Sequence, residues 1–139
     1  MGNWKMNHTI QEANAFCEDV KNAGLVKIAR SKGVMIGVAP SYLALQSVRK
    51  HAHSLIVASQ DAHYMDHGAY TSSVSIPMLK EIGIDWSIIG HSEKRTYEGE
   101  TSFTCNRKIK ALVANKFHVI YCVGETAKEY DEKITKDVI

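Results

Sequence analysis

The sequence has few cysteines, no large excess of charge of either sign and no long apolar run. Its three cysteines, Cys17, Cys105 and Cys122, are odd in number and lack CxxC spacing. This pattern fits a reducing compartment better than a disulfide framework. No segment reads as a signal peptide or as a membrane-spanning helix, so we expect a cytoplasmic protein.

Charge gives no sign of a nucleic-acid or membrane partner. The 17 basic and 15 acidic residues leave a net charge of +2, and neither kind forms a block along the chain. Proteins that bind nucleic acid or anionic membrane surfaces usually carry a concentrated basic patch or tail. We therefore expect neither partner.

Nucleotide-binding and metal-binding motifs are absent as well. GxGxxG, GxxxxGKS/T and GxSxG do not occur, which leaves dinucleotide binding, P-loop chemistry and the hydrolase elbow without support. His51 with His53 and His63 with His67 have spacings that a metal could use, but no cysteine or acidic cluster completes either set. We expect no metal and no cofactor.

Apolar runs alternate with segments of helical spacing along the whole chain. We expect strands over residues 34–39, 55–60, 85–90 and 119–123, and helices that begin at or near Thr9, Ser41, Ser75, Thr101 and Thr126. The strands are continuously apolar, which indicates a parallel sheet covered by helices on both faces. With 139 residues, of which 45% are hydrophobic, the chain is the size of one folded domain.

Two α/β architectures fit this alternation. A five-stranded doubly wound domain suits the length, whereas a (β/α)8 barrel needs about 250 residues. The ends favour part of a barrel, because residues 1–7 read as the loop after a strand and Ile139 falls inside a helical segment. A complete domain does not usually begin and end in this way, so both architectures stay open.

Local signals mark the ends of several expected helices. Thr9 with Glu12 and Thr126 with Glu129 have the spacing of a capping box, in which each side chain satisfies a backbone N–H of the other residue. Gly24 supplies a stop for the first helix.

The most informative stretch spans residues 88–95, where an apolar strand runs into titratable side chains. Gly90 permits a tight turn, and Ser92 is the predicted N-cap of a helix with Glu93 in its first turn. His91 would then lie at the carboxyl end of a strand, near a helix amino terminus whose positive end disfavours protonation of imidazole. Ligand sites of α/β folds lie at this end of the strands. A buried structural histidine is the alternative.

Six segments together resemble the triose-phosphate isomerase family in order and spacing. They are residues 2–7, 39–41, 59–61, 68–71, 89–95 and 122–125, and they extend over the whole chain. The resemblance implies a (β/α)8 TIM barrel, present here as an incomplete barrel of about five βα units. It also implies an isomerase of glycolysis and gluconeogenesis that interconverts dihydroxyacetone phosphate and glyceraldehyde 3-phosphate through an enediolate, without a cofactor, as a homodimer when complete.

The resemblance assigns catalytic and substrate-binding roles to five residues. Asn3 and Lys5 match the N-W-K segment, whose lysine holds the anionic substrate and stabilises negative charge on its oxygens. His91 matches the electrophile that polarises the substrate carbonyl and moves a proton between the two oxygens. This family is itself the standard example of a neutral imidazole that works with a glutamate base. Glu93 matches a supporting residue of the catalytic group, and Ser92 one of the substrate-binding group.

The polar loop between residues 60 and 75 is too long for a simple turn and is expected to be functional. The resemblance makes it a dimer loop. Thr71 matches the loop-tip residue that reaches toward the partner subunit's site, and Tyr70 and Gln60 belong to the same loop.

The sequence departs from the family in several places. Where the family has T-G-E, this chain has Thr71, Ser72 and Ser73. Where the family has the first arginine of H-S-E-R-R, this chain has Lys94. That glutamate and arginine commonly pair across the dimer interface, so the resemblance does not carry this contact over. The A-Y-E-P-x-W segment that supplies the family's glutamate base does not occur, nor do the lid and the late phosphate-binding loops.

We therefore expect residues 1–139 to be a single domain, a partial TIM barrel truncated at both ends, and to be inactive on their own. A free-standing doubly wound βα domain that binds a small phosphorylated ligand or a partner without catalysis is the alternative. The alternative needs no further chain, whereas the barrel needs three more βα units.

Overall fold

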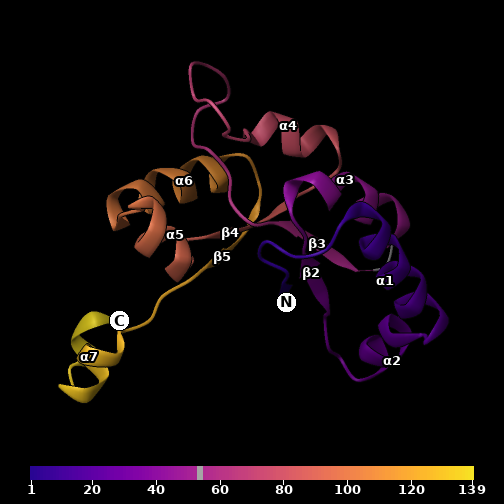
Figure 1. The fold of residues 1–139 in the computed structure, drawn as a ribbon, viewed down its shortest axis with the longest axis horizontal. Helices are drawn as coiled ribbons and strands as arrows, with labels where there is room; N and C mark the ends of the chain where they lie inside the picture. Colours follow the sequence, from indigo (N-terminus) through magenta and orange to yellow (C-terminus); the bar gives the residue numbers. More distant parts are fainter. Residues whose placement is uncertain (53–54) are drawn as a thin grey trace.

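The strands form one parallel sheet in the computed structural model, which describes residues 1–52 and 55–139 (Figure 1). They are β1 (Gly2–Asn3), β2 (Gly37–Ala39), β3 (Ile56–Ser59), β4 (Trp86–Ile89) and β5 (His118–Tyr121). Each strand pairs in parallel with the next, in the order β1-β2-β3-β4-β5. The β4–β5 ladder runs from Trp86 opposite His118 to Ile89 opposite Tyr121.

Eight helices occur in the described residues. They are α1 (Ile10–Asn22), α2 (Leu25–Ser31), α3 (Tyr42–His51), α4 (Ile76–Glu81), α5 (Ser92–Glu98), α6 (Ser102–Ala114), α7 (Ala127–Asp131) and α8 (Thr135–Val138). Every connection between two strands contains at least one helix, as expected for parallel strands, which need a long crossover. The α7 helix follows β5 and lies away from the main body (Figure 1).

The strand order decides between the two architectures. Doubly wound sheets reverse their strand order at a switch point, and the sheet formed by the described residues has no reversal. Crossovers between parallel strands are right-handed. When each crossover adds the next strand at the same edge of the growing sheet, every connecting helix lies on one face of the sheet. The sheet is therefore that of an incomplete (β/α)8 barrel, as the resemblance implied, and the doubly wound alternative is wrong.

Two clusters of buried side chains lie on the two faces of this sheet. The larger cluster combines helix residues such as Leu45 and Leu112 with the strand residues Val57 and Ile89. The smaller cluster is built around three buried strand residues, Ala39, Ala58 and Ile88. Helices thus cover one face alone, and the prediction of helices on both faces is wrong. The prediction failed because the inner face of a barrel is filled by side chains of its own strands, and these are as apolar as the side chains that a helix would cover.

Both predicted capping boxes form. The Thr9 hydroxyl accepts the Glu12 N–H, and the Glu12 carboxylate accepts the Thr9 N–H at 2.7 Å. Thr126 and Glu129 make the same pair of contacts at the start of α7. The α1 helix ends just before Gly24, which has a left-handed φ of 62°. These local signals are confirmed.

The secondary structure differs from the predictions at several places, among them α2, the start of β2, the end of β5 at Tyr121 and the division of the last helical segment into α7 and α8. The α2 helix was not predicted, because its seven residues make less than two full turns and show no clear period. The strand predicted over residues 34–39 begins only at Gly37. Val34 and Met35 are apolar but exposed, and apolar composition alone does not show where a strand meets its neighbour.

The polar loop between β3 and α4 projects from the body (Figure 1) and is ordered by stacked rings. The His63 ring lies against Tyr64 and Tyr70, with centroids 4.3 and 4.2 Å away. The Arg107 guanidinium lies 3.8 Å from the centroid of Tyr64. Such stacking orders a loop that has little core of its own. Near the loop tip, Ser72 has a left-handed φ of 68°.

Replacing Ser72 with glycine should stabilise the protein. A left-handed backbone costs a non-glycine residue about 1–2 kcal/mol, whereas the added chain entropy of glycine costs about 0.5–1 kcal/mol. We expect a net gain of about 1 kcal/mol or less in the free energy of unfolding, measured by urea denaturation. Ser73 has no positive φ, so Ser73→Gly is the matched control and should be destabilising. A lower free energy of unfolding in Ser72→Gly than in wild type would show that the backbone of Ser72 is not strained.

Candidate active site

Three strand ends bring polar side chains to one edge of the sheet. Asn3 ends β1 and is followed by Lys5, Gln60 comes directly after β3, and His91 follows β4. In parallel α/β sheets, the edge formed by the carboxyl ends of the strands is where ligand sites lie. The Gln60 side-chain amide donates to the Lys5 carbonyl at 2.8 Å, so these strand ends are in contact.

Lys5 and His91 share one carboxylate. The Lys5 Nζ lies 2.8 Å from Glu93 Oε1, and the His91 Nδ1 lies 3.3 Å from Glu93 Oε2. The Lys5 and Glu93 side chains are 50% and 43% exposed, so water reaches the pair. The hydrogen bond from Lys5 holds the pKa of the Glu93 carboxyl below its ordinary value. Glu93 is therefore a carboxylate at neutral pH.

The N-cap of α5 is His91 and not Ser92. Gly90 turns the chain at the end of β4 with a φ of 77°, and Ser92 is already the first helical residue. The His91 Nδ1 accepts a hydrogen bond from the Glu93 backbone N–H at 3.3 Å. The prediction of a Ser92 cap is wrong because an imidazole nitrogen can accept the N–H that a serine oxygen usually takes.

This hydrogen bond sets the tautomer of the His91 ring. A ring nitrogen that accepts from a backbone N–H carries no proton, so the neutral ring has its proton on Nε2. The Glu93 carboxylate also lies near Nδ1, but the Lys5 ammonium offsets its charge. His91 thus presents an Nε2–H donor on the other side of the ring.

A hollow of about 310 Å³ opens beside His91. Its walls come from the start of α5 and the segment after β5, and include Gly90, Ser92, Arg95 and Cys122. Arg95 donates to the Gly90 carbonyl and to the Tyr121 hydroxyl, each at 3.0 Å, which fixes one wall. Burial raises the pKa of the Cys122 thiol, so this side chain is a neutral thiol and not a nucleophilic thiolate.

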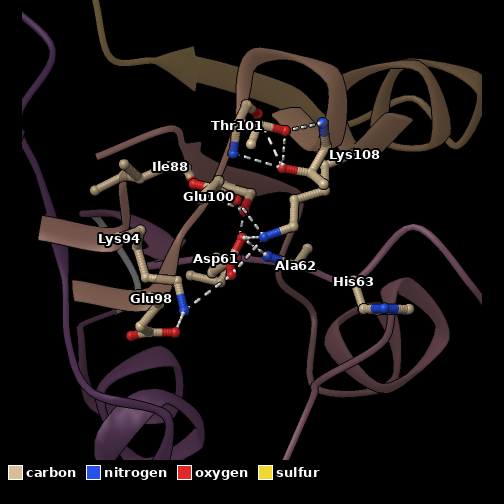
Figure 2. A network of polar contacts seen from close by, with 12 residues as sticks. Asp61, Ala62, His63, Ile88, Lys94, Glu98, Glu100, Thr101 and Lys108 are labelled. Atoms are coloured by element: carbon tan, nitrogen blue, oxygen red, sulfur yellow. Dashed lines mark hydrogen bonds and ion pairs between the residues drawn. The ribbon is translucent and has the colours of Figure 1, made fainter. Parts of the chain in front are cut away.

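A second polar cluster ties α5 and α6 to the end of β3 (Figure 2). Both Asp61 carboxylate oxygens lie 2.8 Å from the Lys108 Nζ. Lys108 also pairs with Glu100. On the other side, the Lys94 Nζ lies 3.5 Å from Asp61 and pairs with Glu98. One carboxylate at the end of a strand therefore holds a lysine from each of two helices.

Lys108 stays charged although its side chain is largely buried. Burial acts to lower the pKa of its ammonium, but the charges and hydrogen bonds of Asp61 and Glu100 outweigh burial and raise the pKa. Removing one partner of such a cluster would leave an uncompensated charge in a poorly hydrated place, which is strongly destabilising.

The whole chain, residues 1–139, matches the family model for triosephosphate isomerase. The chain belongs to the triosephosphate isomerase family. The triosephosphate isomerase of Chlorobium luteolum is 42% identical over 144 residues, covering 100% of this chain and 55% of that protein. The triosephosphate isomerase of Clostridium perfringens strain SM101 is 41% identical over 140 residues, covering 99% of this chain and 54% of that protein. The chain spans about half the length of the curated relatives it matches.

The structure brings together most of the residues to which triosephosphate isomerase roles were assigned. Lys5, His91 and Glu93 form one group, and Asn3 adjoins it through an Oδ1 that accepts the Lys5 N–H at 2.9 Å. Ser92 lines the hollow beside His91. The chemical roles of these five residues remain predictions, because their positions do not by themselves test them.

The predicted dimer-loop residues divide into two groups. Tyr70 and Thr71 are exposed on the projecting loop, and no hydrogen bond or ion pair within the described residues joins them to Lys5 or His91. Gln60 lies at the opposite end of the loop segment, against Lys5. Lys94 pairs within its own chain. The contact with a second subunit therefore remains a prediction.

No group of three or more histidine, cysteine or acidic side chains that could hold a metal occurs in residues 1–52 and 55–139. His53, one member of the H-x-H pair, lies outside the described residues. Among the helices of the described chain, none is long and apolar enough to cross a membrane.

Sequence reasoning missed the charged cluster around Asp61. Asp61, Glu100 and Lys108 are three of many charged residues, and their spacing along the chain gives no signal. They become distinctive only when α6 packs beside the end of β3. The position of Asp61 directly after a strand and a glutamine was the one local hint.

Replacing Lys5 with methionine should remove a pH-dependent contribution to stability. Because Lys5 lowers the pKa of Glu93 in the folded state, the pair stabilises the fold at pH values above the ordinary glutamate pKa of 4.5. The stabilisation is lost as the pH falls through the lower pKa of the folded state. The difference in unfolding free energy between wild type and Lys5→Met should therefore be present at about pH 6 and shrink as the pH falls below about 4.

Lys32→Met is the matched control, because Lys32 is exposed and makes no ion pair with a described residue. The difference in unfolding free energy between Lys32→Met and wild type should be the same at about pH 6 and below about pH 4. A Lys5→Met difference that does not change with pH would contradict the ion pair.

Proposed function

We propose that the complete protein that carries this chain is a triose-phosphate isomerase, which interconverts dihydroxyacetone phosphate and glyceraldehyde 3-phosphate in glycolysis and gluconeogenesis. The observation that carries the proposal is the arrangement of His91 and Lys5 around Glu93. His91 accepts a backbone N–H at Nδ1 and so offers an Nε2–H, while the Lys5 ammonium lies on the same carboxylate. Relatives about 40% identical over the whole chain bear the name of this enzyme.

These residues suit an isomerisation through an enediolate. Removal of the proton from the carbon beside the carbonyl places negative charge on the carbonyl oxygen. A neutral Nε2–H of His91 can donate to that oxygen and pass a proton between the two oxygens, while the Lys5 ammonium stabilises the same charge. The aldose and the ketose have the same oxidation level, so the reaction as proposed needs no cofactor.

The carbon-bound proton must go to a base. The family's A-Y-E-P-x-W segment does not occur in residues 1–139, and we place the glutamate base in a part of the complete protein outside them. Glu93 has another role in this proposal, because its carboxylate is held by Lys5 and lies against His91. It orients both groups, while Asn3 and Ser92 contribute to substrate binding.

The proposal includes the assembly and location of the protein. Residues 1–139 would supply, as a single domain, five of the eight βα units of the barrel. The complete protein would be a cytoplasmic homodimer. The ordered, exposed loop that carries Tyr70 and Thr71 supports the dimer, since a loop that is already ordered loses less entropy on docking. The three free cysteines support a reducing compartment.

The 139 residues by themselves should be close to inactive. Loss of a general base costs about 10²–10⁴-fold in rate, and the missing lid and phosphate loops should add to this loss. A coupled assay would compare turnover by the purified 139-residue chain with turnover by the complete protein. Comparable turnover by the two would show that the base lies within residues 1–139.

Replacing His91 with glutamine in the complete protein should lower turnover more than it weakens substrate binding. Glutamine keeps a hydrogen-bond donor but cannot shuttle a proton, so we expect kcat to fall by about 10²–10⁴-fold with a smaller change in KM. Steady-state kinetics in both reaction directions would measure this. His51→Gln, at an exposed position at the end of α3, is the control and should keep wild-type kinetics. Unchanged turnover in His91→Gln would return His91 to a structural role.

A further inference from the structure

The backbone of Lys5 is held in an unfavourable conformation. Its φ is 55°, in the left-handed region, although it is not a glycine. Such a conformation costs on the order of 1–3 kcal/mol and persists only where surrounding contacts determine it. Because the Lys5 side chain belongs to the candidate site, the groups that hold this backbone in place matter for its chemistry.

Side-chain hydrogen bonds hold Lys5 on both of its peptide groups. The Asn3 Oδ1 accepts the Lys5 N–H at 2.9 Å. The Gln60 Nε2 donates to the Lys5 carbonyl at 2.8 Å and also to the Ala39 carbonyl at 2.9 Å. The Ala39 carbonyl in turn accepts the Trp4 N–H at 3.0 Å. The Gln60 amide thus links the segment after β1 to the end of β2.

This conformation directs the Lys5 side chain. The direction of the Cα–Cβ bond depends on the backbone dihedrals, so a change from the left-handed to an extended or right-handed conformation would swing the ammonium to another side. In the observed conformation, the Lys5 Nζ reaches the Glu93 carboxylate at 2.8 Å. Without its hydrogen bond to Gln60, Lys5 would be held only through its N–H to Asn3, and its carbonyl could turn as the strained backbone relaxes.

We propose that Gln60 is a positioning residue, whose side-chain amide holds the strained Lys5 backbone and thereby places the Lys5 ammonium at Glu93 and in the site. The structural part of this proposal concerns Gln60, Lys5 and Glu93 alone. The consequence for turnover rests on the proposed isomerase function. The resemblance placed Gln60 in the dimer loop, and positioning of Lys5 is a separate role within the same chain.

The chemistry of glutamine suits the position. One NH₂ group carries two N–H donors, which can serve two carbonyl oxygens at once. Asparagine is one methylene shorter and would not reach both. Glutamate has the same length but no donor, and its charge would attract the Lys5 ammonium away from Glu93. Methionine keeps approximately the length and removes both hydrogen bonds without adding charge, which makes Gln60→Met the cleanest test.

The first measurement does not depend on activity. In the complete protein, NMR of the Glu93 side-chain carboxyl would record its titration in wild type, Gln60→Met and Lys5→Met. We expect the Glu93 pKa to rise toward its ordinary value in Gln60→Met, in the same direction as in Lys5→Met, because the hydrogen bond from Lys5 is the largest cause of its lowering. Gln46→Met, at an exposed position of α3, is the matched control and should titrate as wild type. A wild-type titration of Glu93 in a folded Gln60→Met protein would overturn the proposal.

The second measurement separates positioning from loss of structure. With Lys5 displaced, substrate binding is impaired, and we expect kcat/KM in Gln60→Met to fall on the order of 10²-fold with a raised KM. A variant that is merely less stable would lower the active fraction, and so kcat, at an unchanged KM. That outcome, with the pKa of Glu93 unmoved, would overturn the role of Gln60. If wild type itself shows no isomerase activity, the proposed function fails, while the NMR titration still decides whether Gln60 holds Lys5.

Discussion

Parallel pairing of consecutive strands is the constraint on which the candidate site depends. A strand that pairs in parallel with its predecessor must be preceded by a crossover to the opposite end of the sheet. All five strands therefore finish at the same edge. This is why Lys5 comes within hydrogen-bonding distance of both Gln60 and Glu93, which are far from it in the sequence. The helices that return the chain lie on one face, and the polar ends of the strands remain open to solvent.

Lys5 and Ser72 both have a left-handed backbone, but the strain has a different consequence at each position. Lys5 is fixed by hydrogen bonds to both of its peptide groups, and its side chain is part of the site. Ser72 lies on an exposed loop, stands where the family has glycine, and has no side-chain hydrogen bond within the described residues. The strain at Lys5 is coupled to placement of an ammonium group, whereas the Ser72 side chain makes no hydrogen bond to any other described residue. Equal dihedrals therefore do not imply equal roles.

The sequence could predict what local signals determine. Strand and helix alternation, both capping boxes and the position of His91 at a strand end depend on residues close together in the chain, and the structure has them. Strand order could not be read from periodicity, since buried strands are apolar in either architecture. The His91 cap was missed because imidazole is an unusual cap, and the cluster around Asp61 was missed because its members meet only through packing. The family resemblance named site residues but not the contacts that hold them.

The turn after β3 connects the two halves of the site. Gln60 and Asp61 are adjacent, and their side chains reach different neighbours: Gln60 holds the Lys5 backbone, while Asp61 holds Lys94 on α5 and Lys108 on α6. The α5 helix carries Glu93, which pairs with Lys5 and thereby closes a ring of contacts from β3 to Lys5, to Glu93, to α5 and back to β3. In a closed ring, displacement of one member strains all the others. Even a small shift of this turn would therefore move the ammonium of Lys5 relative to the imidazole of His91 at the start of α5. The proposed chemistry depends on the relative position of these two groups.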